Sequence, residues 1–289
     1  MVQTTPSNEI ALQDRYLRVR GVRFRYRKAG RGDPVLLLHG LGASLEQWEW
    51  SQLGLSRRHE VVALDLPGFG WSESPPREQY DLDHIVKLLG GFMDEMGWES
   101  ATVIGNSMGG LLALGMTLRL GRRVNRLVLA GSAGLGREVG WMLRLARIPW
   151  LSEMLVFPMG FRPVAERSLR RLFSDPSRLP SSLVDVTCDL YKGSIIRENL
   201  LHIARTGVSF NGQVDSINFR SQLNRITVPT LLIWGSVDGV IPLEHGRVAH
   251  ELIPGSKLTI FDDCGHVPQI EHPDRFVEEV KRFLSHPGS

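Results

Sequence analysis

Six short, unbroken apolar runs recur along the chain and constrain its fold more than any other feature. They cover residues 35–40, 61–66, 101–105, 126–131, 230–235 and 257–261. Strands that are apolar on both faces are typical of a parallel sheet with helices on both sides. Segments with helical spacing separate most of these runs, at 84–96, 107–120 and 243–252, and a last helix follows Pro273. This alternation predicts an α/β fold with a mostly parallel sheet.

The segment that precedes the first apolar run has a different pattern. Apolar and polar side chains alternate on both sides of Gly21 in RYLRVRGVRFRYR, residues 15–27. A period of two predicts an antiparallel hairpin with one buried face. We expect the arginines on the other face to be solvated and to protect the sheet from edge pairing. A contact site for anions is the alternative.

The interval 133–222 has no strand-like run. It carries four amphipathic helical patches, at 139–148, 165–173, 183–191 and 197–206. We interpret it as a helical cap inserted between core strands, so that the core comprises 1–132 and 223–289. The first patch and the residues after it are rich in Trp, Met, Leu and Phe, and we expect their apolar face to line a substrate pocket. A membrane-surface helix is the alternative for this basic, amphipathic patch.

Ser107 stands in GNSMG, residues 105–109, directly after an apolar run and before a helical one. The pattern matches G-x-S-x-G, and a strand-to-helix turn is the context that this motif requires. Only glycine-sized residues fit two positions before and after the serine, because the turn brings them together. The turn also lifts the hydroxyl clear of the sheet at a helix N-terminus, which favours negative charge. We therefore predict that Ser107 is a nucleophile.

A serine nucleophile needs a base, and the base needs an acid that orients it. Asp238 lies just after one apolar run, and His266 lies in the loop after the next. The order Ser, Asp, His and the position after strand ends are those of this motif. We predict that Asp238 orients His266; Asp262 and Asp263 are second choices for the acid.

Two backbone amides are needed for the oxyanion of acyl transfer. The residue after the nucleophile, Met108, supplies one, and the loop after the early strand supplies the other. In HGLGAS we assign that amide to Leu41, and we expect His39 to hold the loop by hydrogen bonds. Asp65 is expected to fix a tight glycine turn.

Five segments together resemble the α/β-hydrolase superfamily: LLLHGLGAS, VVALDLPGFGWSESP, VIGNSMGGLLAL, LLIWGSVDGVIP and DCGHVPQIEHPDRF. The resemblance covers nearly the whole chain outside the cap. It implies an eight-stranded, mostly parallel sheet, a Ser-His-Asp triad, no cofactor and no metal. Within the superfamily, GNSMGG and the ending GH..QIEHP resemble meta-cleavage-product hydrolases, which cut a C–C bond in vinylogous 1,5-diketone acids from aromatic degradation.

The chain departs from that narrower family at two places. The family carries a tryptophan after the catalytic histidine, where this chain has Val267, and a cap arginine for the substrate carboxylate, whereas residues 181–193 contain none. Arg197 and Arg205 are the candidate substitutes. Val267 is expected to contact the substrate, and Asn106 either contacts it or holds the elbow.

These departures place ester hydrolysis first, on a small apolar substrate through an acyl-enzyme. C–C bond hydrolysis of meta-cleavage products is the alternative. A perhydrolase, a lyase and a non-catalytic ligand receptor are less favoured, and each keeps the same fold.

Composition limits the partners and the compartment. A net charge of +3 over 289 residues gives no case for a nucleic-acid partner. Two distant cysteines, Cys188 and Cys264, provide no disulfide framework and fit a reducing compartment. The N-terminus resembles no signal peptide, and no apolar run reaches the ~20 residues of a spanning helix. We expect a cytoplasmic protein with a small-molecule substrate and no stable membrane insertion.

Overall fold

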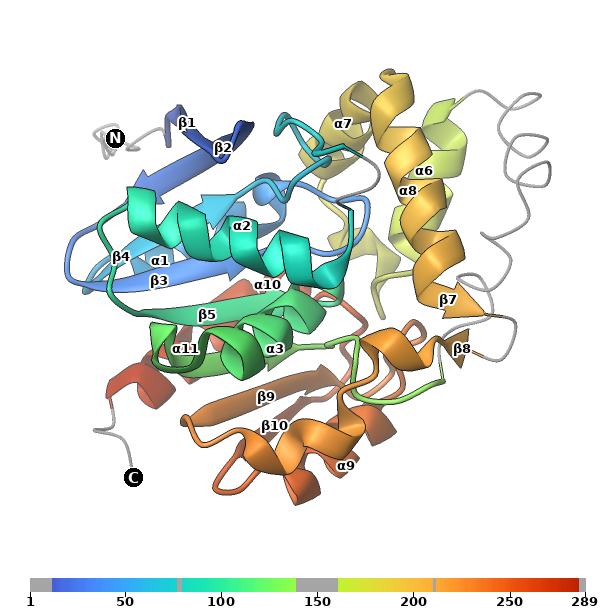
Figure 1. Cartoon of the computed structure of the whole chain (residues 1–289). Coiled ribbons are helices and arrows are strands. Elements are labelled where there is room, and N and C mark those ends of the chain that lie inside the picture. The colour runs from blue at the N-terminus through green and yellow to red at the C-terminus, as the bar shows by residue number, and fades with distance from the viewer. Residues whose placement is uncertain (1–11, 77–79, 139–160, 210–211, 286–289) are drawn as a thin grey trace, which may run out of the picture.

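Eight strands form one mostly parallel sheet at the centre of the protein (Figure 1). The structure is a computed structural model that describes residues 12–76, 80–138, 161–209 and 212–285. In spatial order the strands are β1 (Asp14–Val19), β2 (Val22–Ala29), β4 (His59–Leu64), β3 (Asp33–Leu38), β5 (Ala101–Asn106), β6 (Val124–Ala130), β9 (Thr230–Gly235) and β10 (Lys257–Phe261). Within this eight-stranded sheet, the pairs β1–β2 and β2–β4 are antiparallel and the other described pairs are parallel. This sheet confirms the predicted fold class.

Helices cover both faces of the sheet, as the apolar runs predict. One layer contains α2 (Leu82–Glu95), α3 (Met108–Leu120) and α9 (Leu243–Leu252), and the other contains α1 (Glu49–Leu55), α10 (Pro268–Glu271) and α11 (Pro273–Ser285) (Figure 1). Leu36 and Leu38 of β3 are buried in the first apolar cluster, while Val35 and Leu37 are buried in the second. A strand with two buried faces has no polar side, and this explains the unbroken apolar runs.

The strand order brings several loops together at one edge of the sheet. From β3 the chain continues to β4 on one side, and it later returns to β5 on the other side of β3. Loops that leave two adjacent parallel strands in opposite directions open a crevice at the carboxyl ends of those strands. The loops after β3, β5, β9 and β10 therefore reach the same edge.

Three helices of the interval between β6 and β9 lie beside this edge (Figure 1). They are α6 (Phe161–Arg170), α7 (Ser181–Leu190) and α8 (Ser194–Gly207), and they coincide with three of the four predicted patches. The first patch, 139–148, lies outside the described residues. Two short antiparallel strands follow α8, and the sequence did not indicate them. They are β7 (Val208–Ser209) and β8 (Gly212–Gln213), each of two residues. The domain boundaries at 132 and 222 stay a prediction.

Short 3₁₀ helices complete the described elements. They are η1 (Leu45–Trp48), η3 (Gly121–Arg123), η4 (Pro176–Arg178), η5 (Asp215–Ile217) and η6 (Arg220–Arg225). The first of them follows the loop after β3 and continues directly into α1. It therefore lies next to the edge at which the loops meet.

The first hairpin corrects one expectation. Arg18 is exposed, as expected of a solvated face, but Arg25 is only 2% exposed. Its guanidinium contacts the carboxylates of Asp14 at 2.8 Å, Glu46 at 2.5 Å and Asp65 at 3.1 Å. The prediction of a fully solvated arginine face is wrong at Arg25, because two of these carboxylates are buried and require a buried cation.

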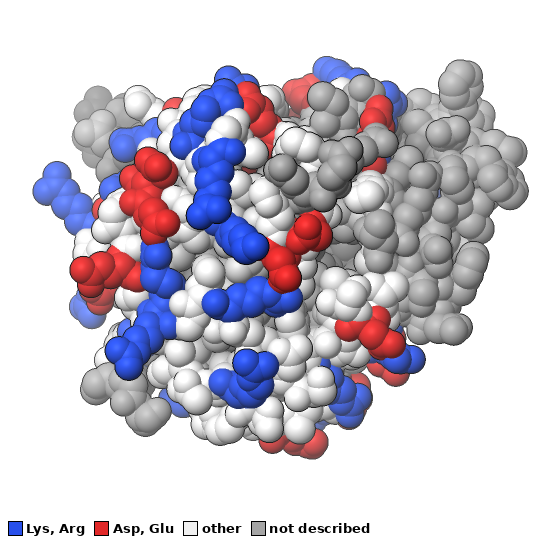
Figure 2. Space-filling model, viewed as in Figure 1, with Lys and Arg blue, Asp and Glu red and all other residues white. Residues whose placement is uncertain are grey.

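The surface over α2 and α3 carries charges of both signs (Figure 2). Arg119 pairs there with Asp83, and Arg123 pairs with Asp94 at 2.6 Å. Lys and Arg side chains run down the middle of this face, with Asp and Glu side chains beside them (Figure 2). In the part of the chain that the structure describes, no helix has the length and apolar character to cross a membrane.

Candidate active site

Ser107 occupies a strained turn between β5 and α3. Its backbone has φ 56° and ψ −116°, a conformation that costs a non-glycine residue free energy. A Cβ atom on Gly105 would lie 2.2 Å from the carbonyl oxygen of Gly109, and one on Gly109 would lie 2.1 Å from that of Leu38. The turn therefore has the shape that the motif predicts, with glycine required on both sides of the serine.

His266 and Asp238 form a buried pair in the loops after β10 and β9. The His266 Nδ1 atom lies 2.8 Å from Asp238 Oδ2, and His266 is 4% exposed. The backbone amides of Val240 and Ile241 donate to Asp238 Oδ1 at 2.8 and 2.9 Å, which fixes the carboxylate. A proton on Nδ1 that is donated to Asp238 leaves Nε2 as the acceptor.

The two second choices for the acid do not take this position. Asp262 and Asp263 are both exposed, on the turn that follows β10. The Asp263 amide donates to Ser236 Oγ at 3.1 Å. The carboxylate that contacts the His266 ring is that of Asp238.

Asn106 joins the elbow to the His266 loop. This residue is fully buried, and its Nδ2 atom donates to the carbonyl oxygens of Ala130 at 2.9 Å and His266 at 3.0 Å. The Ser107 amide donates to the same Ala130 oxygen at 3.1 Å. Ser107 and His266 therefore lie in adjacent loops at one edge of the sheet. The described contacts of Asn106 match its alternative role of holding the elbow, and contact with a substrate stays a prediction.

The loop after β3 passes directly over the elbow. A Cβ atom on Gly40 would lie 3.3 Å from Ser107 Cβ. The Gly40 amide already donates to Gln47 Oε1 at 2.8 Å, so the next amide, that of Leu41, is the first candidate donor to an oxyanion. Met108 begins α3, where an amide has no acceptor inside the helix. Both residues stay the predicted donors.

His39 holds this loop, as the sequence predicts. It is fully buried, its Nδ1 atom lies 2.8 Å from the Gly40 carbonyl oxygen, and the Leu66 amide donates to Nε2 at 2.9 Å. Burial lowers the pKa of His39 from 6.5 to about 4, so the ring is neutral at physiological pH.

Asp65 fixes the neighbouring turn, which also confirms its expected role. Its carboxylate accepts hydrogen bonds from the amides of Leu45 at 2.7 Å and Trp71 at 2.8 Å. Complete burial raises the pKa of Asp65 to about 6, although the charge of Arg25 acts in the opposite direction.

Val267 is packed between the core and the predicted cap. It is 1% exposed and belongs to an apolar cluster with Phe173, Leu183 and Ile270. The first two come from the interval between β6 and β9, and Ile270 belongs to α10. Its described contacts are therefore with protein, and contact with a substrate stays a prediction.

Glu271 is a supporting residue that stands in the QIEHP segment, but the sequence did not assign it a role. Its carboxylate is buried and accepts hydrogen bonds from the amides of Gly265 at 2.7 Å and Asp175 at 3.0 Å. The His266 amide donates to the Leu172 carbonyl oxygen at 2.7 Å. The loop that carries the predicted base is thus held by residues of the predicted cap, and no sequence motif marks such distant partners.

A cavity of about 640 Å³ lies among α6, α7 and α8. It is lined by Arg162, Asp185, Cys188, Asp189, Tyr191, Lys192 and Arg197. The Tyr191 hydroxyl donates to the Gly42 carbonyl oxygen at 3.2 Å, so the wall of this cavity contacts the loop of Leu41. Two of the cations are paired, Arg162 with Asp185 and Lys192 with Asp189. No ion pair to Arg197 is found among the described residues, and the side chain of Arg205 lies outside them.

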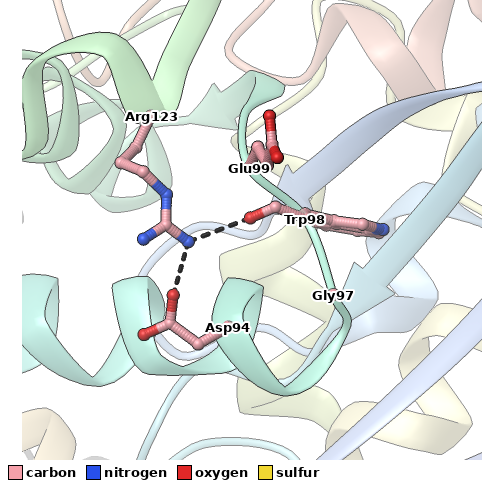
Figure 3. Close-up of a pocket in the computed structure, with 5 residues that line it drawn as sticks. All are labelled: Asp94, Gly97, Trp98, Glu99 and Arg123. Carbon is pink, nitrogen blue, oxygen red and sulfur yellow. Dashed lines mark hydrogen bonds and ion pairs between the residues drawn. The ribbon is translucent and has the colours of Figure 1, made fainter.

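A second hollow, of about 430 Å³, lies at the opposite edge of the sheet (Figure 3). Trp98 and Glu99 precede β5, and Arg123 precedes β6, so they mark the amino ends of these strands. Arg123 donates to Asp94 at 2.6 Å and to the Trp98 carbonyl oxygen at 3.0 Å (Figure 3). This hollow does not belong to the candidate site. Within the described ranges, no group of three or more His, Cys, Asp or Glu side chains could hold a metal ion.

The comparison with known proteins agrees with this geometry. A family model described as the alpha/beta hydrolase fold matches residues 33–273. The chain belongs to the α/β-hydrolase family. The resemblance noted from the sequence is therefore confirmed.

Relatives at about 30% identity span nearly the whole chain. An uncharacterized protein of Mycobacterium tuberculosis is 30% identical over 92% of this chain and 79% of its own length. The 2-hydroxy-6-oxo-6-(2'-aminophenyl)hexa-2,4-dienoic acid hydrolase of Metapseudomonas resinovorans is 30% identical over 98% of this chain and 94% of its own. The solved structure of a meta-cleavage product hydrolase from Pseudomonas fluorescens is 28% identical, with a TM-score of 0.79 over 93% of this chain and 97% of that one.

Proposed function

We propose that this α/β hydrolase is a serine hydrolase in which Ser107 is the nucleophile, His266 the general base and Asp238 the acid that orients it. One observation carries the proposal. A serine in a strained, glycine-flanked elbow follows Asn106, which is hydrogen-bonded to the loop that carries a buried histidine–carboxylate pair. A strand-to-helix turn does not need the buried pair of His266 and Asp238. A serine nucleophile does need a base, and the base needs a third group that orients it.

The reaction follows from these positions. Ser107 Oγ attacks the substrate carbonyl carbon while His266 Nε2 accepts the hydroxyl proton, and Asp238 stabilises the imidazolium. The amides of Leu41 and Met108 donate to the oxyanion. His266 then gives the proton to the leaving group, and water hydrolyses the acyl-enzyme.

For the bond that is cut, we place C–C hydrolysis of a dienoate ahead of ester hydrolysis. This reverses the order expected from the sequence. The support is that relatives aligned over more than nine-tenths of the chain are named as dienoate or meta-cleavage product hydrolases. A carbon leaving group must first be stabilised by ketonisation of the dienol, and this step needs a fixed substrate carboxylate. Arg197 is the described cation that best suits this carboxylate, because it lines the cavity behind the Leu41 loop and has no described ion pair.

Ester hydrolysis is the second candidate, and a specific observation favours it. Helix α7 contains no arginine, and the neighbour of His266 is an aliphatic residue packed against protein rather than a tryptophan. Ester cleavage needs only the nucleophile, the base and two backbone donors, which the core supplies by itself.

Two experiments test the proposal. A fluorophosphonate probe should label Ser107 and no other residue. Labelling of a Ser107→Ala variant would refute the assignment of Ser107 as the nucleophile.

Steady-state kinetics should then compare a phenyl-substituted dienoate with a medium-chain aryl ester. A tenfold higher kcat/KM for the dienoate, about 1.4 kcal/mol in transition-state binding, supports C–C hydrolysis, and the reverse ratio supports the ester.

An arginine variant tests the carboxylate contact separately. We expect Arg197→Gln to lower kcat/KM for the dienoate by at least tenfold and to leave the ester unchanged, because only the dienoate carries a carboxylate. Arg167→Gln, at an exposed arginine of α6 that does not line the cavity, is the matched control. Equal effects of the two variants on the dienoate refute the role of Arg197.

A further inference from the structure

Gln47 connects two loops of the candidate site from a position that no motif marks. It belongs to η1, just beyond the loop of Leu41, and is 5% exposed. Its Oε1 atom accepts from the Gly40 amide at 2.8 Å, and its Nε2 atom donates to Asn106 Oδ1 at 2.7 Å. One side chain therefore links the residue before the predicted oxyanion donor to the residue before the predicted nucleophile.

The orientation of both amides follows from their partners. Asn106 has two carbonyl oxygens, those of Ala130 and His266, within 3.0 Å of one side-chain atom, and this atom must be the NH₂ group. The other atom is then an oxygen and needs a donor, which the NH₂ group of Gln47 supplies at 2.7 Å. The oxygen of Gln47 consequently faces the Gly40 amide. Every polar atom in this series has a partner of the correct kind.

We propose that Gln47 is a positioning residue that sets the spacing between the Leu41 amide and Ser107. This inference rests on the proposed function, since it assumes that Ser107 is attacked through an oxyanion. Gly40 precedes Leu41 in the chain, and a Cβ atom on Gly40 would lie 3.3 Å from Ser107 Cβ, so a displaced Gly40 also displaces the Leu41 amide relative to Ser107. Oxyanion donors act within 2.7–3.1 Å of the developing charge, and a misplacement of about 1 Å costs about 10²-fold in rate.

The competing explanation is that Gln47 only stabilises the core. Gln52 provides the matched control, because it is equally buried on the adjoining helix and its amide also makes two hydrogen bonds. Its Nε2 atom donates to the carbonyl oxygens of Arg27 at 2.8 Å and Val61 at 3.1 Å, away from the loops of the site. Replacing either glutamine by methionine removes two hydrogen bonds at nearly constant volume.

The test compares Gln47→Met with Gln52→Met on whichever substrate the wild-type enzyme turns over. We expect Gln47→Met to lower kcat by 10- to 100-fold with KM within threefold of wild type. It should also weaken inhibition by a phenylboronic acid, which forms a tetrahedral adduct on the serine, by a similar factor. Gln52→Met should keep kcat within twofold while losing as much thermal stability. Equal kcat values for the two variants overturn the proposal.

A second variant keeps the test decisive if Gln47→Met does not fold. Gln47→Glu retains an acceptor for the Gly40 amide and lacks a donor for Asn106 unless the carboxyl is protonated. Its kcat relative to wild type should therefore rise as the pH falls from 8 to 6, and a constant ratio contradicts the inference. Failure of the proposed function is separate: wild-type Ser107 then remains unlabelled by the fluorophosphonate, whatever residue 47 is.

Discussion

His39 should make the stability of this protein depend on pH in a measurable way. Burial lowers the pKa of its folded-state ring from 6.5 to about 4. The unfolded chain then binds the proton more tightly than the folded one, so stability is complete above pH 6.5 and is lost as the pH falls toward 4. The full difference of about 2.5 pKa units corresponds to about 3 kcal/mol, of which about 2 kcal/mol falls between pH 7 and pH 5. Domains have only about 5–15 kcal/mol of stability in total.

Urea unfolding at pH 7 and pH 5 tests this value in wild type and in His39→Gln. Glutamine retains an acceptor for the Leu66 amide and does not titrate, and the other ionisable groups are the same in both proteins. We expect the wild-type free energy of unfolding to fall by about 2 kcal/mol more than that of the variant. An identical pH dependence of the two proteins would refute the conclusion that the buried ring is held neutral.

Three further substitutions have expected outcomes. Asp238→Asn should retain the thermal midpoint and lower kcat by about 10⁴-fold, as in serine proteases, and full activity would transfer the acid role to another residue. Gly109→Ala should prevent formation of the elbow, because its Cβ atom would lie 2.1 Å from the Leu38 carbonyl oxygen, whereas Gly193→Ala meets no atom closer than 3.7 Å and should express and fold normally. Arg25→Met should cost about 3–5 kcal/mol in unfolding free energy, because it leaves buried carboxylates unpaired; a loss below 1 kcal/mol contradicts the buried ion network.

The sheet and the elbow could be predicted because their signals are local. A short, unbroken apolar run that ends at a glycine, such as residues 230–235, favours a buried strand, and a serine between two glycines after a strand favours one turn shape. The order of Asp238 and His266 along the chain predicts that they are partners. Their pairing depends on the adjacency of β9 and β10, which the α/β pattern already implies.

The burial of Arg25 and the role of Gln47 could not be predicted, because both depend on partners far away in sequence. In the hairpin, Arg25 has the same alternating pattern as Arg23 and Arg27, and its contact with the buried Asp65 distinguishes it, because Glu46 also contacts Arg27. Gln47 stands between Glu46 and Trp48, in a segment that resembles an ordinary helix start. Its partner Asn106 is 59 residues away, so no window of sequence contains the pair.

The two ends of the long interval between β6 and β9 lie side by side, and this has an evolutionary consequence. The two strands are hydrogen-bonded neighbours, and beyond them the Phe219 amide donates to the Gly134 carbonyl oxygen at 2.7 Å. A segment that leaves and re-enters through adjacent points can change in length and sequence at little cost to the sheet, since loop closure entropy grows only slowly with length. Lineages could therefore exchange this segment as one unit, provided that the new segment kept the contacts that Leu172 and Asp175 make with the His266 loop and with Glu271. The adjacent ends of this segment, at Gly134 and Phe219, are points at which protein engineers can graft the corresponding segment of another hydrolase.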